Sequence, residues 1–181
     1  MIYVLIAVVV LVILVAVMYN GLIRARVRVE NAWSQIDVQL KRRIDLIPNL
    51  VETVKGYAAH EQQTLDAVIK ARNAAASAAP TPGAQAAADG ALSGALRQLF
   101  ALSESYPDLK ANQNFLALQE ELTATEGRVA YARQFYNDSV MHFNTGIQKF
   151  PTVFIARLGG FTAKEFFGAE DADRVVPKVQ F

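Results

Sequence analysis

The sequence predicts an all-α protein in which an N-terminal transmembrane helix precedes an antiparallel, up-and-down four-helix bundle. Three observations support this fold class: an uncharged apolar opening stretch, hydrophobic residues at helical spacing, and no period-two alternation before the last few residues. We divide the 181 residues into a transmembrane anchor (1–23), a helical bundle (24–150) and an aromatic-rich C-terminal segment (151–181).

The opening stretch is the strongest signal. Residues 2–18 are almost entirely Val, Ile, Leu and Ala, and the first charged side chain is Arg24. A helix from Ile2 to about Leu22 would span about 30 Å, the thickness of a bilayer's hydrocarbon core. A buried core helix would rarely be apolar on every face, and a cleaved signal peptide would have a basic start and a small-residue cleavage site. We therefore favour an uncleaved anchor over these two alternatives.

The residues after the apolar stretch predict its orientation. Tyr19 falls where an interfacial aromatic residue is expected, and Arg24, Arg26 and Arg28 follow it. By the positive-inside rule, the N-terminus lies outside and the bundle lies in the cytoplasm. The three arginines would lie within about 10 Å of the interface, which makes them candidates for contact with anionic lipid. The basic run 41–43 would stand about 25–30 Å away, beyond the Debye length of about 8 Å.

The body shows helical spacing with several predicted interruptions. One stripe comprises Val29, Trp33, Ile36, Leu40 and Ile47. Pro48 predicts a kink or a short break near Ile47, because a residue before proline avoids helical angles. The Ala-rich range 74–90 contains Pro80, Pro82 and Gly83, and predicts a fraying helix end followed by a loop.

Two more helices follow the predicted loop. The first is short and ends near Tyr106-Pro107, after which Asp108 is predicted to cap the last helix. The last helix has a heptad seam, which is typical of helices packed at a shallow angle. The seam comprises Phe115, Leu118, Leu122, Thr125, Val129, Ala132, Tyr136, Ser139, Phe143, Ile147 and Phe150. Its small and polar members predict close approach or a buried hydrogen bond.

The C-terminal segment is rich in aromatic residues. Phe154, Phe161, Phe166 and Phe167 occur near basic residues and a glycine pair. Two interpretations remain open: the segment plugs one end of the bundle, or it dips into the membrane surface or a neighbouring subunit. An antiparallel four-helix bundle returns the end of its fourth helix to the membrane side, which suits either interpretation. The final residues 175–181 could form an extended tail.

Catalytic, cofactor-binding and metal-binding sites are not predicted. The chain has two histidines, His60 and His142, and neither has a Glu three positions before it, as a di-metal bundle requires. Asp138 precedes His142 by four residues, which suits a hydrogen bond better than a metal site. Cysteine is absent, and no phosphate-binding loop or nucleophile elbow occurs. A net charge of +1 without a basic tract argues against a nucleic-acid partner.

A polar and aromatic cluster in the first stripe has two interpretations. It comprises Asn31, Trp33, Gln35 and Asp37. These residues form a possible interaction site for a ligand or partner, or they are a buried Trp with polar neighbours that cap or face water. We favour the second interpretation, because Trp33 lies in the predicted apolar stripe.

Several motifs resemble the LemA family over nearly the whole chain. They are the stretches 29–43 (VENAWSQIDVQLKRR), 45–51 (DLIPNLV), 109–112 (LKAN), 133–137 (RQFYN) and 177–179 (PKV). Ile44 and Gly146 depart from the polar residues expected there. The resemblance implies an N-terminal membrane helix and a four-helix bundle, usually in bacteria, and hence a single-pass protein of the bacterial inner membrane. It implies no settled activity, although relatives have been linked with membrane stress, membrane proteases and membrane remodelling.

These observations predict a non-enzymatic scaffold that self-associates or organises partners at the bilayer, in membrane remodelling or stress. The predicted partners are the lipid bilayer, further copies of the chain and a membrane protein. The alternative is an adaptor that regulates a membrane enzyme such as a protease or a sensor. An unrecognised enzyme is the least supported hypothesis, because no catalytic constellation was found.

Overall fold

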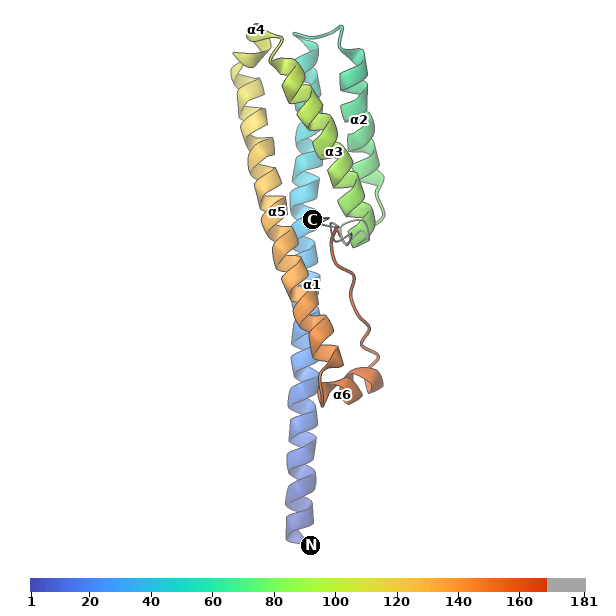
Figure 1. Cartoon of the computed structure of the whole chain (residues 1–181). Coiled ribbons are helices and arrows are strands. Elements are labelled where there is room, and N and C mark those ends of the chain that lie inside the picture. The colour runs from blue at the N-terminus through green and yellow to red at the C-terminus, as the bar shows by residue number, and fades with distance from the viewer. Residues whose placement is uncertain (169–181) are drawn as a thin grey trace, which may run out of the picture.

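The computed structural model describes residues 1–168, which are almost entirely helical and contain no strand (Figure 1). The all-α fold class is therefore confirmed. The helices are α1 (Ile2–Lys55), α2 (Gln62–Ser77), α3 (Pro82–Ser103), α4 (Pro107–Lys110), α5 (Gln113–Gln148) and α6 (Thr152–Leu158). The motif at 177–179 and the predicted tail at 175–181 lie outside the described residues.

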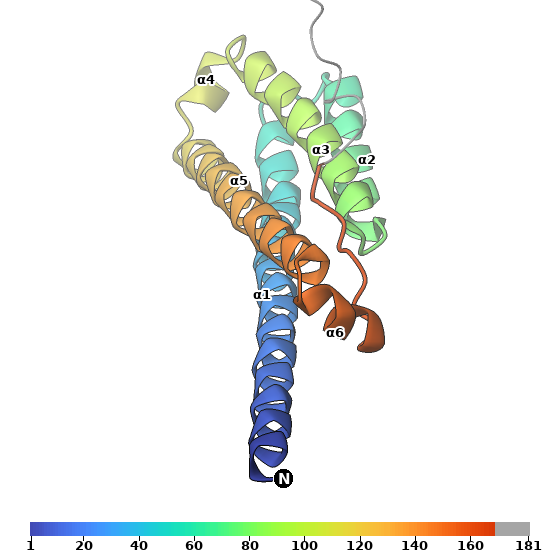
Figure 2. The same ribbon diagram turned by 60° about the horizontal axis from the view of Figure 1, so that its bottom comes forward.

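Helices α1, α2, α3 and α5 run alternately up and down, an arrangement compatible with the predicted four-helix bundle (Figures 1 and 2). The two longest helices, α1 and α5, pack against each other, and α2 packs against both α1 and α3. Helices α2 and α3 accompany only the part of α1 that lies far from the N-terminus (Figure 1). The bundle therefore has a distal half with four helices and a proximal half with two.

Each half has its own apolar core. In the distal half, α1 from Ile47 onward packs with α2, α3, α4 and the start of α5 as far as Leu122. In the proximal half, α1 from Leu22 to Leu40 packs with α5 from Val129 onward. Side chains from α6 and from the segment after it complete this second core. The C-terminal segment thus takes the place that α2 and α3 occupy in the distal half.

The N-terminal third of α1 projects from the bundle without a partner (Figure 1). Residues 1–17 are all exposed, and Leu22 is the first buried residue of α1. This helix is long and apolar enough to cross a membrane. Because its apolar stretch has no protein contacts, the alternative of a buried core helix is not supported.

Two expected interruptions differ from the structure. Helix α1 continues through Pro48, which is exposed, and Ile47 and Leu50 pack in the core on either side of it. Tertiary packing on both sides of a proline can retain a helix that loses one hydrogen bond. The loop predicted over 74–90 is confined to 78–81, because Pro82 occupies the first turn of α3, where proline is tolerated.

The last long helix follows its predicted seam but not its predicted cap. Asp108 lies in the first turn of α4, and the side chain of Asn112 caps α5 by accepting from the Phe115 N–H group at 3.0 Å. Of the seam, Leu118 is half-buried and Phe150, beyond the helix end, is 81% exposed. All the other seam residues are buried: Phe115, Leu122, Thr125, Val129, Ala132, Tyr136, Ser139, Phe143 and Ile147.

Candidate functional site

The C-terminal segment is tied along the proximal half by two asparagines of α5. Asn137 donates to the Phe167 carbonyl at 3.2 Å and accepts from the Phe167 N–H group at 2.8 Å. Asn144 forms the same reciprocal pair with the backbone of Lys164, at 2.8 Å in both directions. Because the two asparagines are seven residues apart on α5, they share one helix face. We call residues 161–168 the strap.

Aromatic stacking adds to these hydrogen bonds. The Trp33 ring lies 5.5 Å from the Tyr136 ring and 6.2 Å from the Phe167 ring, measured between centroids. The Arg133 guanidinium lies over the Phe167 ring at 4.9 Å. Gly168 ends the described strap with φ of 74°, and a Cβ there would stand 2.9 Å from Arg133 Nη2. The motif 133–137 therefore holds the strap with three of its side chains.

Tyr136 also contacts the strap directly. Its hydroxyl donates to the Glu165 carbonyl at 2.9 Å. Burial raises the pKa of Tyr136 above its ordinary value of 10.0, and the nearby Glu165 carboxylate raises it further. The neutral hydroxyl is thus the form that the folded protein favours.

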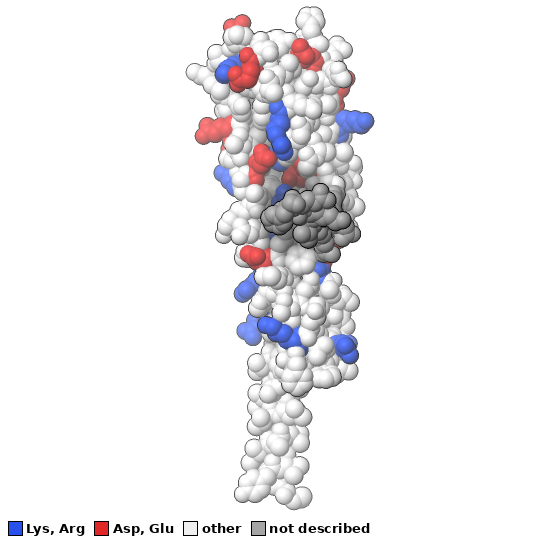
Figure 3. All heavy atoms as spheres, viewed as in Figure 1, with Lys and Arg blue, Asp and Glu red and all other residues white. Residues whose placement is uncertain are grey.

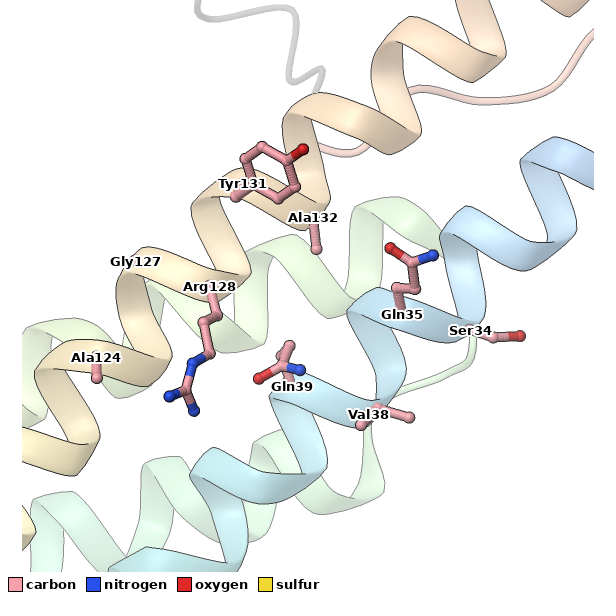
Figure 4. A pocket seen from close by; sticks show the side chains of 9 residues that line it. All are labelled: Ser34, Gln35, Val38, Gln39, Ala124, Gly127, Arg128, Tyr131 and Ala132. Carbon is pink, nitrogen blue, oxygen red and sulfur yellow. The ribbon is translucent and has the colours of Figure 1, made fainter.

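The residues of the polar and aromatic cluster predicted on α1 lie on two faces of the helix. Trp33 is half-buried under the strap, whereas Asn31 and Asp37 are exposed. Gln35 lines a groove between α1 and α5 (Figure 4). Asn31 and Gln35 lie four residues apart and share one face of the helix, whereas Trp33 and Asp37 share another. The surrounding of Trp33 agrees with the interpretation of a packed aromatic residue.

The groove between α1 and α5 has a volume of about 590 Å³. Small residues, Ala124, Gly127 and Ala132, form the α5 side, where the helix has little bulk (Figure 4). Two apolar side chains stand at its edges: Val38 is 60% exposed and Tyr131 is 72% exposed. The remaining lining residues are polar: Ser34, Gln35, Gln39 and Arg128. The groove is thus a shallow surface feature with small residues on its α5 side and polar residues along it.

The predicted membrane-interface residues lie where α1 leaves the bundle, with one exception. The Tyr19 ring packs edge-on against Phe161 at 5.8 Å, and the Arg26 guanidinium lies 5.5 Å from the Phe161 ring. Arg24 and Arg28 are exposed, as is Phe154, and Phe166 is half-buried. Phe167 is only 2% exposed, so the structure corrects its predicted place at the lipid surface: the strap inserts this side chain into the proximal core.

An apolar ridge along α6 joins Phe154, which the sequence analysis considered for the membrane surface, with Phe150 and Leu158, which it did not. Phe150, Phe154 and Leu158 are 81%, 57% and 90% exposed. Their spacing of four residues was visible in the sequence, but only the structure shows that the described residues leave them uncovered. Phe150 and Phe154 pack edge-on at 6.1 Å. The ridge lies at the level where the projecting part of α1 begins (Figures 1 and 2).

Charged residues are distributed unevenly along the molecule. The projecting helix carries no charged side chain, and a band of Lys and Arg residues lies at the adjoining end of the bundle (Figure 3). His60 and His142 are both exposed. Within residues 1–168, no three His, Asp or Glu side chains gather in a way that could hold a metal ion. The candidate functional features of the described residues are therefore the groove, the apolar ridge and the basic band.

The fold and these surfaces define a class: a membrane-associated helical protein with one N-terminal helix that could cross a bilayer. Comparison with known proteins gives the family. The LemA family model matches residues 32–181, and the chain belongs to the LemA family.

Individual relatives agree with this membership. The chain is 27% identical over 159 residues to Protein LemA of Metamycoplasma hominis, covering 86% of this chain and 71% of the relative. It is 30% identical over 95 residues to Magnetosome protein MamQ of Magnetospirillum gryphiswaldense, covering 51% of this chain and 35% of the relative. Magnetosome protein MamQ 2 of Paramagnetospirillum magneticum is 32% identical over 85 residues, covering 47% of this chain and 31% of the relative. The chain thus matches only about a third of the length of the MamQ proteins.

Proposed function

We propose that this protein is a membrane-anchored, non-enzymatic helical scaffold that rests on one bilayer surface and self-associates there. The observation that carries the proposal is the distribution of exposed apolar side chains. They cover the whole projecting part of α1 and recur in the ridge, at the level where that part begins. A scaffold held at two points has a fixed orientation on the membrane, which a single flexible tether would not give.

The ridge supplies the second point of attachment. Burying one Phe or Leu side chain contributes about 1.5–3 kcal/mol, so three such side chains in the interface contribute several kcal/mol. Lys149 and Arg157 are exposed next to the ridge and can reach anionic headgroups. Such a combination of aromatic and basic residues suits a helix that lies in the interface.

The groove between α1 and α5 supplies a surface for self-association. Copies anchored in one bilayer present this groove at the same height, because the anchor fixes the distance of each residue from the membrane. Val38 of one copy can then meet the groove of the next without any tilt of the bundle. We therefore propose a second copy of this chain as the occupant of the groove, which makes the protein a homo-oligomer.

Crosslinking in membranes tests this proposal. The chain contains no cysteine, so a single Val38→Cys substitution places one thiol at the edge of the groove. We expect Val38→Cys to form disulfide-linked dimers under mild oxidation in isolated membranes. The matched control, Ala91→Cys, places a thiol on an exposed position of α3 outside the groove and should remain monomeric.

Three outcomes would contradict the proposal or change it. A protein that carbonate washing releases from membranes would rule out the anchor. Equal crosslinking of the two variants would rule out the groove as the contact. Crosslinks from Val38→Cys to a different membrane protein alone would favour the alternative, an adaptor that regulates a membrane enzyme.

We further propose a bacterial inner-membrane location with the N-terminus outside and the bundle in the cytoplasm. The basic residues Arg24, Arg26 and Arg28 follow the apolar stretch directly, and this asymmetry supports the orientation. A C-terminal fluorescent reporter that matures only in the cytoplasm should be active. Activity of a reporter that works only outside the cytoplasm would reverse the orientation.

A further inference from the structure

A small basic pocket lies between α1 and α5, close to the point where α1 leaves the bundle. It has a volume of about 240 Å³ and is lined by Gly21, Arg24, Ala25 and Arg28 of α1 and by His142 of α5. Three of these five residues are cationic or can become so. The sequence analysis treated the arginines and His142 separately, and only the packing of α5 on α1 brings them together.

The cations of this pocket lack acidic partners in the described part of the chain. Within residues 1–168, no carboxylate oxygen lies within 4.0 Å of Arg24, Arg28 or His142, although such pairs occur elsewhere. Arg26, which lies between the two arginines in sequence, already pairs with Glu30 at 3.8 Å. Of the Arg24 guanidinium nitrogens, only Nε forms a hydrogen bond within the described residues, to the Asn20 carbonyl at 3.3 Å. The pocket therefore has donors for an anion.

The pocket lies at the height of the lipid headgroups if α1 crosses the bilayer. At a rise of about 1.5 Å per residue, Arg24 stands about 3 Å and Arg28 about 9 Å beyond Leu22, the end of the apolar span. Each headgroup layer is about 5–8 Å thick, by difference between the whole bilayer and its hydrocarbon core. The two guanidinium groups therefore bracket the layer that contains the phosphates.

The size of the pocket restricts the ligand. Sites for drug-sized molecules measure about 300–1,000 Å³, so this smaller pocket suits a single phosphate group. Gly21 leaves the pocket open on one side, because a Cβ built there would meet no other atom within 4 Å. Arginine matches phosphate oxygens through paired N–H donors, and a protonated histidine adds a further donor.

We propose that this headgroup pocket binds the phosphate of one anionic phospholipid of the bilayer in which the protein is anchored. The inference rests on the proposed membrane anchor and adds a specific ligand to it. The bound lipid would bridge α1 and α5, so that the lipid composition of the membrane stabilises the proximal half.

Native mass spectrometry of the full-length protein in mild detergent tests this inference. The protein is supplied with equal amounts of phosphatidylglycerol and phosphatidylcholine, and we expect the wild type to retain one phosphatidylglycerol preferentially. The double variant Arg24→Gln/Arg28→Gln should bind phosphatidylglycerol about tenfold more weakly or worse, because it loses one or two charge-assisted hydrogen bonds. His142→Gln should show a smaller fall of about threefold, and His142→Arg should restore retention.

A steric variant distinguishes lipid binding in the pocket from attraction of lipid by the general surface charge. Gly21→Leu keeps every charge but fills the pocket, so it should lose the lipid as the double variant does. Its matched control is Gly90→Leu on α3, where a Cβ also meets no atom within 4 Å. The control for charge is Lys70→Gln/Arg97→Gln, which removes two exposed cations from α2 and α3. Both controls should retain lipid as the wild type does.

Several results would overturn the inference. Retention by Gly21→Leu, or an equal loss in Lys70→Gln/Arg97→Gln, would show that diffuse charge attracts the lipid. Displacement of the lipid by millimolar inorganic phosphate would show a site for a soluble anion. Circular dichroism identifies any variant that fails to fold. If the double variant does not fold, retention of lipid by His142→Arg and its loss by Gly21→Leu still test the pocket. If the wild-type protein stays in membranes but shows no lipid preference, the result contradicts this inference alone. If the wild-type protein is released from membranes, the result contradicts the proposed function.

Discussion

The distal and proximal halves of the bundle use the same two helices, α1 and α5, but cover them differently. In the distal half, α2 and α3 complete the core with apolar side chains. In the proximal half, α6 and the strap cover the pair, and the strap is held largely by side chain-to-backbone hydrogen bonds from Asn137 and Asn144. Helices therefore complete one core, whereas an extended segment completes the other.

A buried polar layer separates the two halves. Arg43, Asp89 and Thr125 are all buried, and they lie between the apolar residues of the two cores. Arg43 Nη1 bonds Asp89 Oδ1 at 2.7 Å, while Glu126, which is more than half exposed, lies 3.7 Å from Arg43 Nη2. The pair joins α1 to α3 where α3 begins to cover α1. The pair therefore marks the boundary between the two cores.

The two halves are expected to open differently. Residues of α2 and α3 pack along the whole distal core, so the distal half should unfold as a unit. The strap contributes few buried side chains and can detach while α1 and α5 stay paired, because local opening requires only the loss of local contacts. The predictions below test this difference, beginning with the largest expected effect.

Asp89→Ala should destabilise the distal half most. Removing one partner of a buried ion pair leaves a buried charge and costs about 3–5 kcal/mol. Thermal unfolding of the full-length protein in detergent, followed by circular dichroism, should show a clear fall in Tm. The control Glu126→Ala removes the exposed carboxylate next to Arg43 and should cost about 0–1 kcal/mol.

The double variant Arg43→Met/Asp89→Leu sharpens this test. Replacing both charges by apolar side chains should restore most of the stability that Asp89→Ala loses. If Asp89→Ala proves as stable as Glu126→Ala, the buried pair does not hold the two helices together, and the polar layer has no structural role.

Asn137→Ala should affect the proximal half alone. It removes both hydrogen bonds to Phe167, and leaving those backbone groups without partners costs about 1–3 kcal/mol. Hydrogen exchange should show faster exchange of the Phe167 amide, with no change at Leu50 in the distal core. Asn114→Ala is the matched control, because Asn114 is an exposed asparagine of the same helix. Equal acceleration at Leu50 would show that the two halves open together.

Tyr136→Phe should produce the smallest effect, about 0.5–1.5 kcal/mol for the bond to the Glu165 carbonyl. The pKa of Tyr136 is raised in the folded state, so the wild-type hydroxyl stabilises the strap below pH 10 and loses this effect as pH rises through the raised pKa. The difference between the tyrosinate absorbance titrations of the two proteins should give a midpoint above 10.0 for Tyr136. A midpoint at or below that value would place Tyr136 in water, away from the strap.

The sequence predicted the elements of the fold better than their boundaries. Residues at helical spacing must be buried on one face, so the seam of α5 and the stripe of α1 could be recognised without tertiary information. The continuity of α1 through Pro48 could not be predicted in this way. Packing on both sides of the proline outweighs the local tendency of proline to interrupt a helix. The early start of α3 has a local signal that the sequence analysis did not use: Pro82 lies in the first turn, and the Thr81 side chain caps the helix by accepting from the Ala84 N–H group.

The candidate surfaces also combine features that the sequence predicts with features that only the tertiary structure shows. Val38, Tyr131, Phe150 and Leu158 carry no local signal, because exposure depends on what the rest of the chain covers. Asn137 and Asn144 share a helix face by their spacing, yet the backbone that they bind lies 30 and 20 residues further along the chain. His142 could be placed beside Arg24 and Arg28 only after α5 had been packed on α1.

Sequence by itself determined the helical class and the one helix that is apolar throughout, because periodicity and hydrophobicity act over a few neighbouring residues. Tertiary structure decided which faces remain open, where the C-terminal segment lies and which charges meet. These features depend on residues far apart in the chain, since burial and electrostatic contact follow distance in space.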